Sequence, residues 1–199
     1  MTILCCDPGF SHYGCAVFDT TGKPIKLGTL TTEASKTKMA RISDDKAYRI
    51  AQLTTQLSNV IQQNKIQAVL GEMPGAGGQS ARAIQAMAIA TAVSVAVFTM
   101  FRLPVEWTTP VEVKKALTGN KSASKIEMME AACKRYGWRI EKKEVRSKKS
   151  GAVDIVKRVY NVYYPLNQKT SASTFEHVAD SLGVYEALKH CNIARMFIK

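Results

Sequence analysis

The sequence lacks the cysteine patterns that cross-link secreted domains by disulfide bonds or bind structural zinc. Its five cysteines include no Cys-x-x-Cys pair, and the odd number leaves one unmatched. Cys5 and Cys6 are adjacent on an expected strand, where their side chains point to opposite faces and cannot easily bridge each other. A disulfide framework and a zinc site are therefore not expected, and reduced thiols indicate a cytoplasmic protein. The chain begins directly in an apolar strand, so we expect no signal peptide.

Acidic residues are scarce relative to basic ones. The chain has 16 Asp and Glu against 28 Lys and Arg, a formal net charge of +12, which indicates a polyanionic partner. Nucleic acid is the first candidate and anionic lipid the second. Much of the excess lies within residues 134–158, which hold 10 basic and 3 acidic side chains. Such a run is either a solvated loop or a phosphate-contacting segment, and the second interpretation is favoured in a compact basic domain.

Charge is absent from residues 83–101, a stretch long enough to cross a bilayer. The stretch is rich in alanine, which contributes little to membrane insertion, and it includes four polar side chains. Spanning would also place Glu72 and Asp180 on opposite sides of a membrane. We therefore expect a helix buried in the core and no membrane association.

The order of predicted elements indicates one α/β domain of 199 residues. Three strands joined by tight turns form an antiparallel meander, and helices then alternate with two more strands. The prediction is a mixed five-stranded sheet with helices on both faces and a basic insertion at about 139–173. The expected strands are 2–6, 13–18, 25–32, 68–70 and 104–107. The expected helices are 38–63, 80–101, one from Thr109-Pro110 to Gly119, one capped by Ser122 and ending near Tyr136, and 174–190. Residues 138–173 are expected to be irregular, apart from a short helix at about 155–160.

Four polar residues stand where apolar side chains are expected: Asp7, Glu72, His177 and Asp180. Asp7 and Glu72 each end an apolar strand, and His177 and Asp180 lie three apart on one helix face. Taken singly, each has an ordinary explanation: a turn-opening Asp, a solvent-facing Glu, and polar residues near a helix N-terminus. Together they can converge on one point. Clustered carboxylates in a cytosolic protein most readily share a hard divalent cation such as Mg²⁺ or Mn²⁺.

These residues lie in motifs that resemble the Holliday-junction resolvases of the RuvC type, members of the ribonuclease-H-like superfamily. The motifs are DPG followed by a glycine on the first strand, the fourth-strand glutamate with the helix after it, VKKALTGNKSASK, and HVADSLGVYEALKH. The resemblance implies that Asp7, Glu72, His177 and Asp180 bind metal. It also places Lys114 and Lys125 near the scissile phosphate, although both have the alternative of being ordinary solvent-facing helix lysines.

The chain departs from the bacterial members in two places. About 35 irregular, basic residues precede the last helix, which is closer to a phage-type variant acting in a host cytoplasm. The aromatic wedge that family members often carry after the fourth-strand glutamate is replaced by Met73-Pro74-Gly75. Phe10, Tyr13 and Trp107 are the remaining candidates for a wedge.

The implied activity is endonucleolytic cleavage of four-way DNA junctions. Two Mg²⁺ ions, for which Mn²⁺ would substitute, activate a water and stabilise the departing 3′ oxygen, which leaves a 5′ phosphate. The two-fold symmetry of a junction favours a homodimer, in which the helix from Ser80 to Phe101 either supplies the contact or packs on the core. The basic insertion, which includes Tyr160, Tyr163 and Tyr164, is expected to bind a DNA arm. The sequence specifies no branch-migration helicase as a partner.

Three other functions compete with this one. A related ribonuclease-H-like nuclease would cut flaps, forks or RNA–DNA hybrids. A sugar-kinase or actin-like phosphotransferase would use DPGFSHYG as a phosphate loop, although the short chain and its positive charge argue against that. A non-catalytic DNA-binding scaffold would keep the fold and bind DNA without metal.

Overall fold

The computed structural model describes residues 1–35, 41–75, 80–149, 152–164 and 168–198. Its elements run in the following order: β1 Thr2–Asp7, β2 His12–Asp19, β3 Pro24–Thr31, α1 Ile42–Gln63, β4 Ile66–Glu72, α2 Ala81–Met100, β5 Val105–Thr108, α3 Pro110–Thr118, α4 Lys125–Tyr136, β6 Arg139–Lys149, β7 Ala152–Tyr164, β8 Gln168–Ser171, α5 Ala172–Leu188 and α6 Asn192–Phe197. The break predicted after Glu72 extends into residues 76–79, which lie outside the described residues.

The first five strands form a mixed sheet in the order β3-β2-β1-β4-β5. β1 is antiparallel to β2, which is antiparallel to β3, so the predicted meander is confirmed. β1 is parallel to β4, and β4 is parallel to β5. Because β1 and β4 are parallel neighbours, their carboxyl ends lie at the same edge of the sheet.

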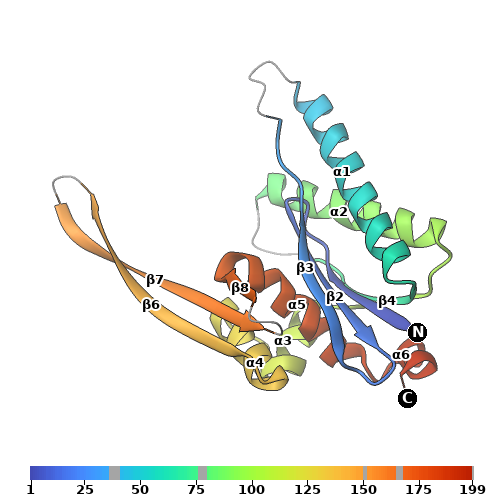
Figure 1. Ribbon diagram of the computed structural model, residues 1–199. Helices are drawn as coiled ribbons and strands as arrows, with labels where there is room; N and C mark the ends of the chain where they lie inside the picture. The colour runs from blue at the N-terminus through green and yellow to red at the C-terminus, as the bar shows by residue number, and fades with distance from the viewer. Residues whose placement is uncertain (36–40, 76–79, 150–151, 165–167, 199) are drawn as a thin grey trace.

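Helices cover both faces of this sheet, as predicted (Figure 1). Cys5 belongs to a buried cluster shared with α3, α4 and α5, whereas Cys6 belongs to a second cluster shared with α1 and α2. Consecutive residues of β1 thus serve opposite layers, as a strand's alternation requires. All five cysteines are free.

Two helix starts follow from side-chain caps. Thr109 caps α3 with a capping box to Glu112, and Pro110 is the first helical residue, as predicted. For α4 the predicted cap, Ser122, is wrong by two residues. Ser124 accepts the backbone N–H of Glu127, and the Glu127 carboxylate accepts the N–H of Ser124. This reciprocal pair satisfies two helix-end donors, so the helix begins at Lys125.

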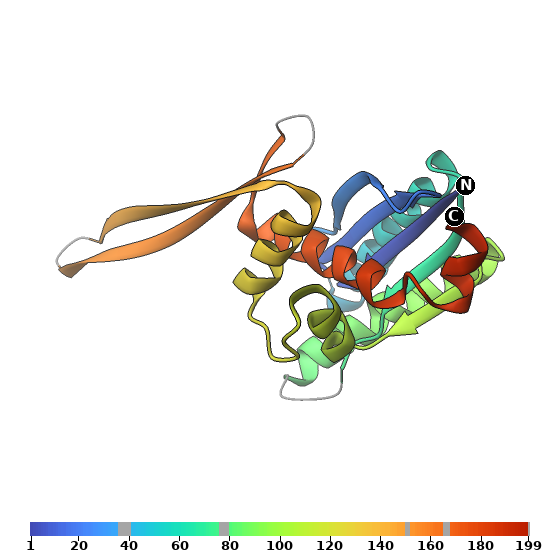
Figure 2. The same cartoon turned by 90° about the horizontal axis from the view of Figure 1, so that it is seen from below.

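The prediction of irregular structure before the last helix is wrong. β6, β7 and β8 form a second, antiparallel sheet, and strand β7 replaces the short helix expected at 155–160. The β6–β7 hairpin leaves the body as a long arm (Figures 1 and 2). At about 3.3 Å per residue, an 11-residue strand reaches roughly 35 Å. At its base, Ile140 lies opposite Val162, which is fully buried in the core.

α2 is long and apolar enough to cross a membrane by length and composition. One of its faces instead packs against the sheet through Ala90, Val93, Val97 and Phe98. Ser94 on the same face shares a buried hydrogen bond of 2.9 Å with the Tyr13 hydroxyl. The expected core helix is thus buried along one side only, because Ile84, Val95 and Met100 are exposed.

Candidate metal centre

The candidate site lies where the parallel strands β1 and β4 end and α5 crosses the sheet. Asp7 is the last residue of β1, and Glu72 is the last residue of β4. His177 and Asp180 come from α5, whose first turn is fixed by the Ser171 hydroxyl accepting the N–H of Thr174. Segments about 170 residues apart in the chain therefore present polar groups to one point.

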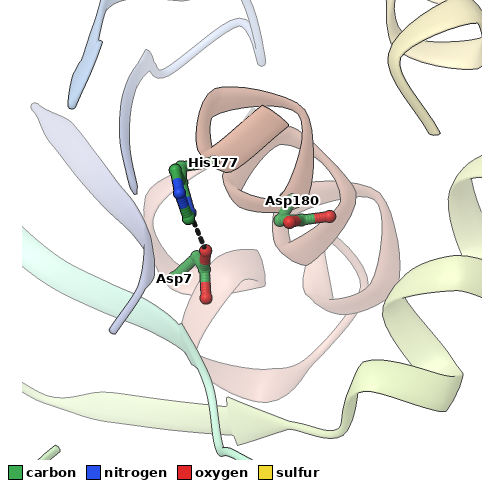
Figure 3. A group of neighbouring side chains, drawn as sticks. All are labelled: Asp7, His177 and Asp180. Carbon is green, nitrogen blue, oxygen red and sulfur yellow. Dashed lines mark hydrogen bonds and ion pairs between the residues drawn. The ribbon is translucent and has the colours of Figure 1, made fainter. Parts of the chain in front are cut away.

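The side chains of Asp7, His177 and Asp180 meet at short range (Figure 3). One ligand atom from each lies within 4.8 Å of the other two. His177 Nδ1 is 3.1 Å from Asp7 Oδ2, and the two side chains remain 24% and 19% exposed, so ions and substrate can reach them. Glu72 is close enough to Asp7 and Asp180 for their charges to raise its pKa.

Gly14 permits this approach of α5 to the sheet. It lies directly opposite Asp7 in the β1–β2 ladder. A Cβ there would stand 2.1 Å from the His177 carbonyl oxygen and 2.5 Å from Ser181 Oγ, distances that no real side chain tolerates. The hydroxyl of the fully buried Ser181 in turn donates to that carbonyl oxygen at 2.9 Å. The missing side chain at position 14 therefore sets how closely His177 approaches Asp7.

The carboxylates repel one another in a partly dry environment. Burial, followed by the charges of Asp7 and Asp180, raises the pKa of Glu72 to about 9. Burial and the charge of Asp7 raise the pKa of Asp180 to about 7. The hydrogen bond to Asp7 raises the pKa of His177 above its ordinary value. The shifts of Glu72 and Asp180 thus follow from burial and from the neighbouring carboxylates, and that of His177 follows from its hydrogen bond to Asp7.

The two predicted lysines lie beside the cluster. Lys114 on α3 lowers the pKa of Glu72, and Lys125 at the start of α4 lowers that of Asp180. The Lys125 ammonium is paired with Glu176, which immediately precedes His177 on α5. Because the Lys125 side chain is 74% exposed, its charge stays accessible to a ligand.

Sequence reasoning missed His12, Gly14 and Glu176. The exposed His12 ring stacks on the His177 ring, with centroids 5.4 Å apart and planes 3° from parallel. His12 follows the DPG motif by three residues, but no local pattern links it to residue 177. The three aromatic candidates for a wedge are not exposed: Tyr13 and Phe10 are buried, and Trp107 is half-buried near Phe98.

The donor set fits a hard divalent cation. Carboxylate oxygens with one imidazole suit Mg²⁺ or Mn²⁺, and no thiol belongs to the cluster that meets here. Asp7 and Asp180 meet here with Glu72 beside them, outside the group whose ligand atoms lie within 4.8 Å of one another. These acids also need a counter-charge, which the adjacent lysines supply only from outside the cluster. A cation bound among the four side chains would provide it directly.

Known proteins share the fold that carries these residues. A family model described as crossover junction endodeoxyribonuclease RuvC matches residues 3–135. The solved structure of Thermus thermophilus RuvC in complex with a Holliday junction substrate is 18% identical, with a TM-score of 0.62; the match covers 98% of this chain and 96% of that one. A second Thermus thermophilus RuvC structure gives a TM-score of 0.58 at the same identity and coverage. These structures show that the fold is ribonuclease-H-like. No curated protein matches the chain by sequence.

The metal-free protein is expected to lose stability as the pH rises from about 5 to about 9. The raised pKa values of Glu72 and Asp180 mean that the folded state keeps protons that the unfolded chain has already released. The raised pKa of His177 acts in the same direction, because its favourable charge is lost on deprotonation. Saturating Mg²⁺ should restore the melting temperature most at high pH, since it binds the deprotonated carboxylates.

Replacing one of the crowded acids separates this effect from general pH sensitivity. Glu72→Gln should stabilise the metal-free protein by about 1–3 kcal/mol near pH 8 and flatten its pH dependence. Glu130→Gln, at an exposed position on α4, is the matched control. Equal pH profiles for both variants and the wild type, measured by thermal unfolding in chelator, would contradict the proposed crowding.

Proposed function

The chain belongs to the RuvC family of crossover junction endodeoxyribonucleases, and from that membership we propose that it resolves four-way DNA junctions by metal-dependent paired nicking. The observation that carries the proposal is the meeting of Asp7, His177 and Asp180 from β1 and α5, with Glu72 of β4 beside them. These residues are far apart in the chain, and local structure gives no reason for their side chains to converge. A shared metal ion would give one.

Asp7, Glu72, His177 and Asp180 would hold the metal. Two bound Mg²⁺ or Mn²⁺ ions would supply a hydroxide nucleophile at neutral pH and would neutralise the departing 3′ oxygen, and the product would carry a 5′ phosphate. Asp7 occupies His177 Nδ1 and so leaves Nε2 for a metal ion or the attacking water. Lys114 and Lys125 offset the negative charge that builds on the phosphate. For that role Lys125 would exchange its contact with Glu176 for the phosphate.

A homodimer matches the two-fold symmetry of a four-way junction. The outer face of α2 supports it. Ile84, Met87 and Ala92 line an apolar hollow of about 540 Å³ next to Met73 and Pro74. Within the part of the chain that the structure describes, Thr91 Oγ1 in the same hollow is buried without a hydrogen-bond partner. Small side chains on this face would allow a second α2 to approach closely.

The dimer proposal predicts a strong effect of Ala92→Glu. A two-fold axis would bring each new carboxylate close to its copy within an apolar contact, so the dissociation constant of the dimer should rise at least about tenfold. Sedimentation of the wild type, Ala92→Glu and the surface control Gln62→Glu on α1 measures it. A wild type that sediments as a monomer, alone and on junction DNA, would contradict the proposal.

The β6–β7 arm supplies a second region for contact with DNA. Residues 139–164 hold eight basic and three acidic side chains, and the arm extends beyond the body that carries the metal centre (Figure 2). Phosphate contacts there would bind a junction arm at a distance from the cut. Of the three tyrosines expected to stack on DNA, Tyr163 instead donates to Glu141 at the base of the arm. The side chains of Tyr160 and Tyr164 lie outside the described residues.

Neutralising Lys142, Lys143, Lys148 and Lys149 together to glutamine should weaken junction binding and flatten its salt dependence. Each phosphate contact contributes about 0.9 to the slope of log affinity against log salt concentration, so loss of two or more contacts should give a measurable decrease in the slope. Lys23→Gln with Lys26→Gln, at the opposite end of the sheet, is a control that removes two positive charges away from the arm and should leave the slope unchanged. An unchanged slope in the fourfold variant would refute the role of the arm.

Substrate choice separates the proposal from its rivals. The wild type should nick four-way junctions faster than flaps, Y-forks or RNA–DNA hybrids in Mg²⁺, and the nicks should carry 5′ phosphates. Asp7→Asn should lower incision at least about 100-fold while junction binding persists, because the variant weakens metal binding and leaves the basic surfaces intact. Preferential cutting of flaps or hybrids would favour a related nuclease, and binding without any incision in Mn²⁺ would favour a scaffold.

A further inference from the structure

A second hollow, of about 600 Å³, lies between the N-terminal halves of α1 and α2. Its inner wall is the turn after β1, through Phe10 and Ser11. The next residue is His12, whose ring stacks on His177 of the metal centre. The hollow and the metal centre therefore flank the same turn at the same edge of the sheet. Neither the metal chemistry nor the proposed dimer contact uses the hollow.

The hollow is positively charged. Lys46, Arg49 and Arg82 line it, against one acid, Asp45. The Asp45 carboxylate accepts the backbone N–H of Ser35, so part of its hydrogen-bonding capacity is already used. None of the three cations forms an ion pair with any residue that the structure describes. A cluster of cations without acidic partners is arranged to receive an anion.

Arg49 is held in place for such a ligand. Its Nε donates to Thr32 Oγ1 at 3.0 Å, and its Nη2 donates to Ser11 Oγ at 2.6 Å. The guanidinium lies 4.4 Å from the centroid of the Phe10 ring. Thr32 is itself buried, and its hydroxyl donates to the Phe10 carbonyl at 2.6 Å. These contacts use two of the five N–H donors, so the remaining donors can face the hollow without further ordering of the side chain.

The other two cations lie at the mouth of the hollow. Lys46 Nζ donates to Gln85 Oε1 at 2.8 Å, which links α1 to α2 across the hollow. Arg82 is exposed in the first turn of α2. The neutral partner of Lys46 leaves its charge uncompensated, and the helix N-terminus beside Arg82 adds to the positive potential.

We propose that this hollow is a second phosphate-binding subsite, which takes a backbone phosphate of the DNA strand that flanks the cut. The inference rests on the proposed nuclease function and extends it. A strand that crosses the β1–β2 turn over His12 has one phosphate at the metal centre and another within reach of Lys46, Arg49 and Arg82. A guanidinium fork suits phosphate oxygens, and a phosphate held there fixes the register of the strand on the metal centre.

The first test measures binding without incision. In the full-length Asp7→Asn background, Lys46→Gln with Arg82→Gln should weaken binding of a fluorescent four-way junction and lower its salt slope by about 1 to 2. Lys23→Gln with Lys26→Gln removes the same charge at the far end of the sheet and should leave the slope unchanged. Equal effects of the two pairs would mean diffuse attraction and would overturn the subsite.

The second test finds the phosphate. Junctions that carry a single uncharged methylphosphonate are bound to Asp7→Asn protein with and without the Lys46/Arg82 pair of substitutions. At one position near the cut, the methylphosphonate should lower the affinity of the junction for the protein that keeps Lys46 and Arg82. It should have little effect on the affinity for the protein in which both are replaced. Arg49→Lys, which keeps the charge and loses the fork, should give an intermediate loss at that same position. If no methylphosphonate position distinguishes the two proteins, the proposal fails.

Calorimetry with inorganic phosphate and a mononucleotide separates DNA from a free small anion. Either ligand binding the hollow, with an unchanged junction salt slope, would overturn the assignment to DNA. The outcomes also separate this inference from the nuclease proposal. If the protein cuts no substrate but the Lys46/Arg82 variant changes the salt slope, the subsite stands and the nuclease function fails. If the protein cuts junctions and the variant leaves the slope unchanged, the nuclease function stands and the subsite fails.

Discussion

Mutual repulsion among partly buried acids at one edge of the sheet is the constraint on which this molecule depends. β1 and β4 run parallel, so the carboxylates that end them are neighbours, and α5 adds Asp180 to the same point. Burial, followed by the charge of Asp7, raises the pKa of Glu72 and of Asp180. Gly14 brings α5 still closer, although a side chain there would relieve the crowding. This arrangement supports the proposal that the acids at this edge bind cations.

The sequence predicts the members of the cluster because each is marked by a local pattern. Asp7 and Glu72 end apolar strands, and residues 177 and 180 share a helix face by their spacing alone. The placement of Lys114 and Lys125 came instead from a family resemblance. Local patterns contain nothing about the stacking of His12 on His177, the pairing of Lys125 with Glu176, or the close approach at Gly14. These contacts join residues that are 51 to 165 apart in the chain. Packing of α5 on β2 creates two of them, and packing of α5 on α4 creates the Lys125–Glu176 pair.

The β6–β7 arm shows where sequence patterning fails for a different reason. Strand prediction depends on one buried face, which produces alternation of apolar and polar residues. Most of Arg139–Lys149 is charged, so its sequence shows no clear alternation of apolar and polar residues; at its base Ile140 packs on the core opposite Val162. Pairing with β7 makes the segment a strand, and pairing is not visible in a single sequence. The predicted N-cap of α4 was wrong by only two residues. Ser122 and Ser124 can both cap a helix, and only the capping box with Glu127 decides between them.

The separation of charge over the molecule has a consequence for how DNA is held. The net charge is +12, yet the point where chemistry is proposed is acidic and repels phosphate until metal binds. Affinity for DNA must therefore come from elsewhere, and both cationic regions described here lie outside the cluster: the β6–β7 arm and the hollow beside Arg49. Binding and cutting then depend on different residues. On the proposed function, that division accounts for a cluster of acids within a basic protein: the surrounding cations would bring the phosphate close, and a bound metal would reverse the sign of the site.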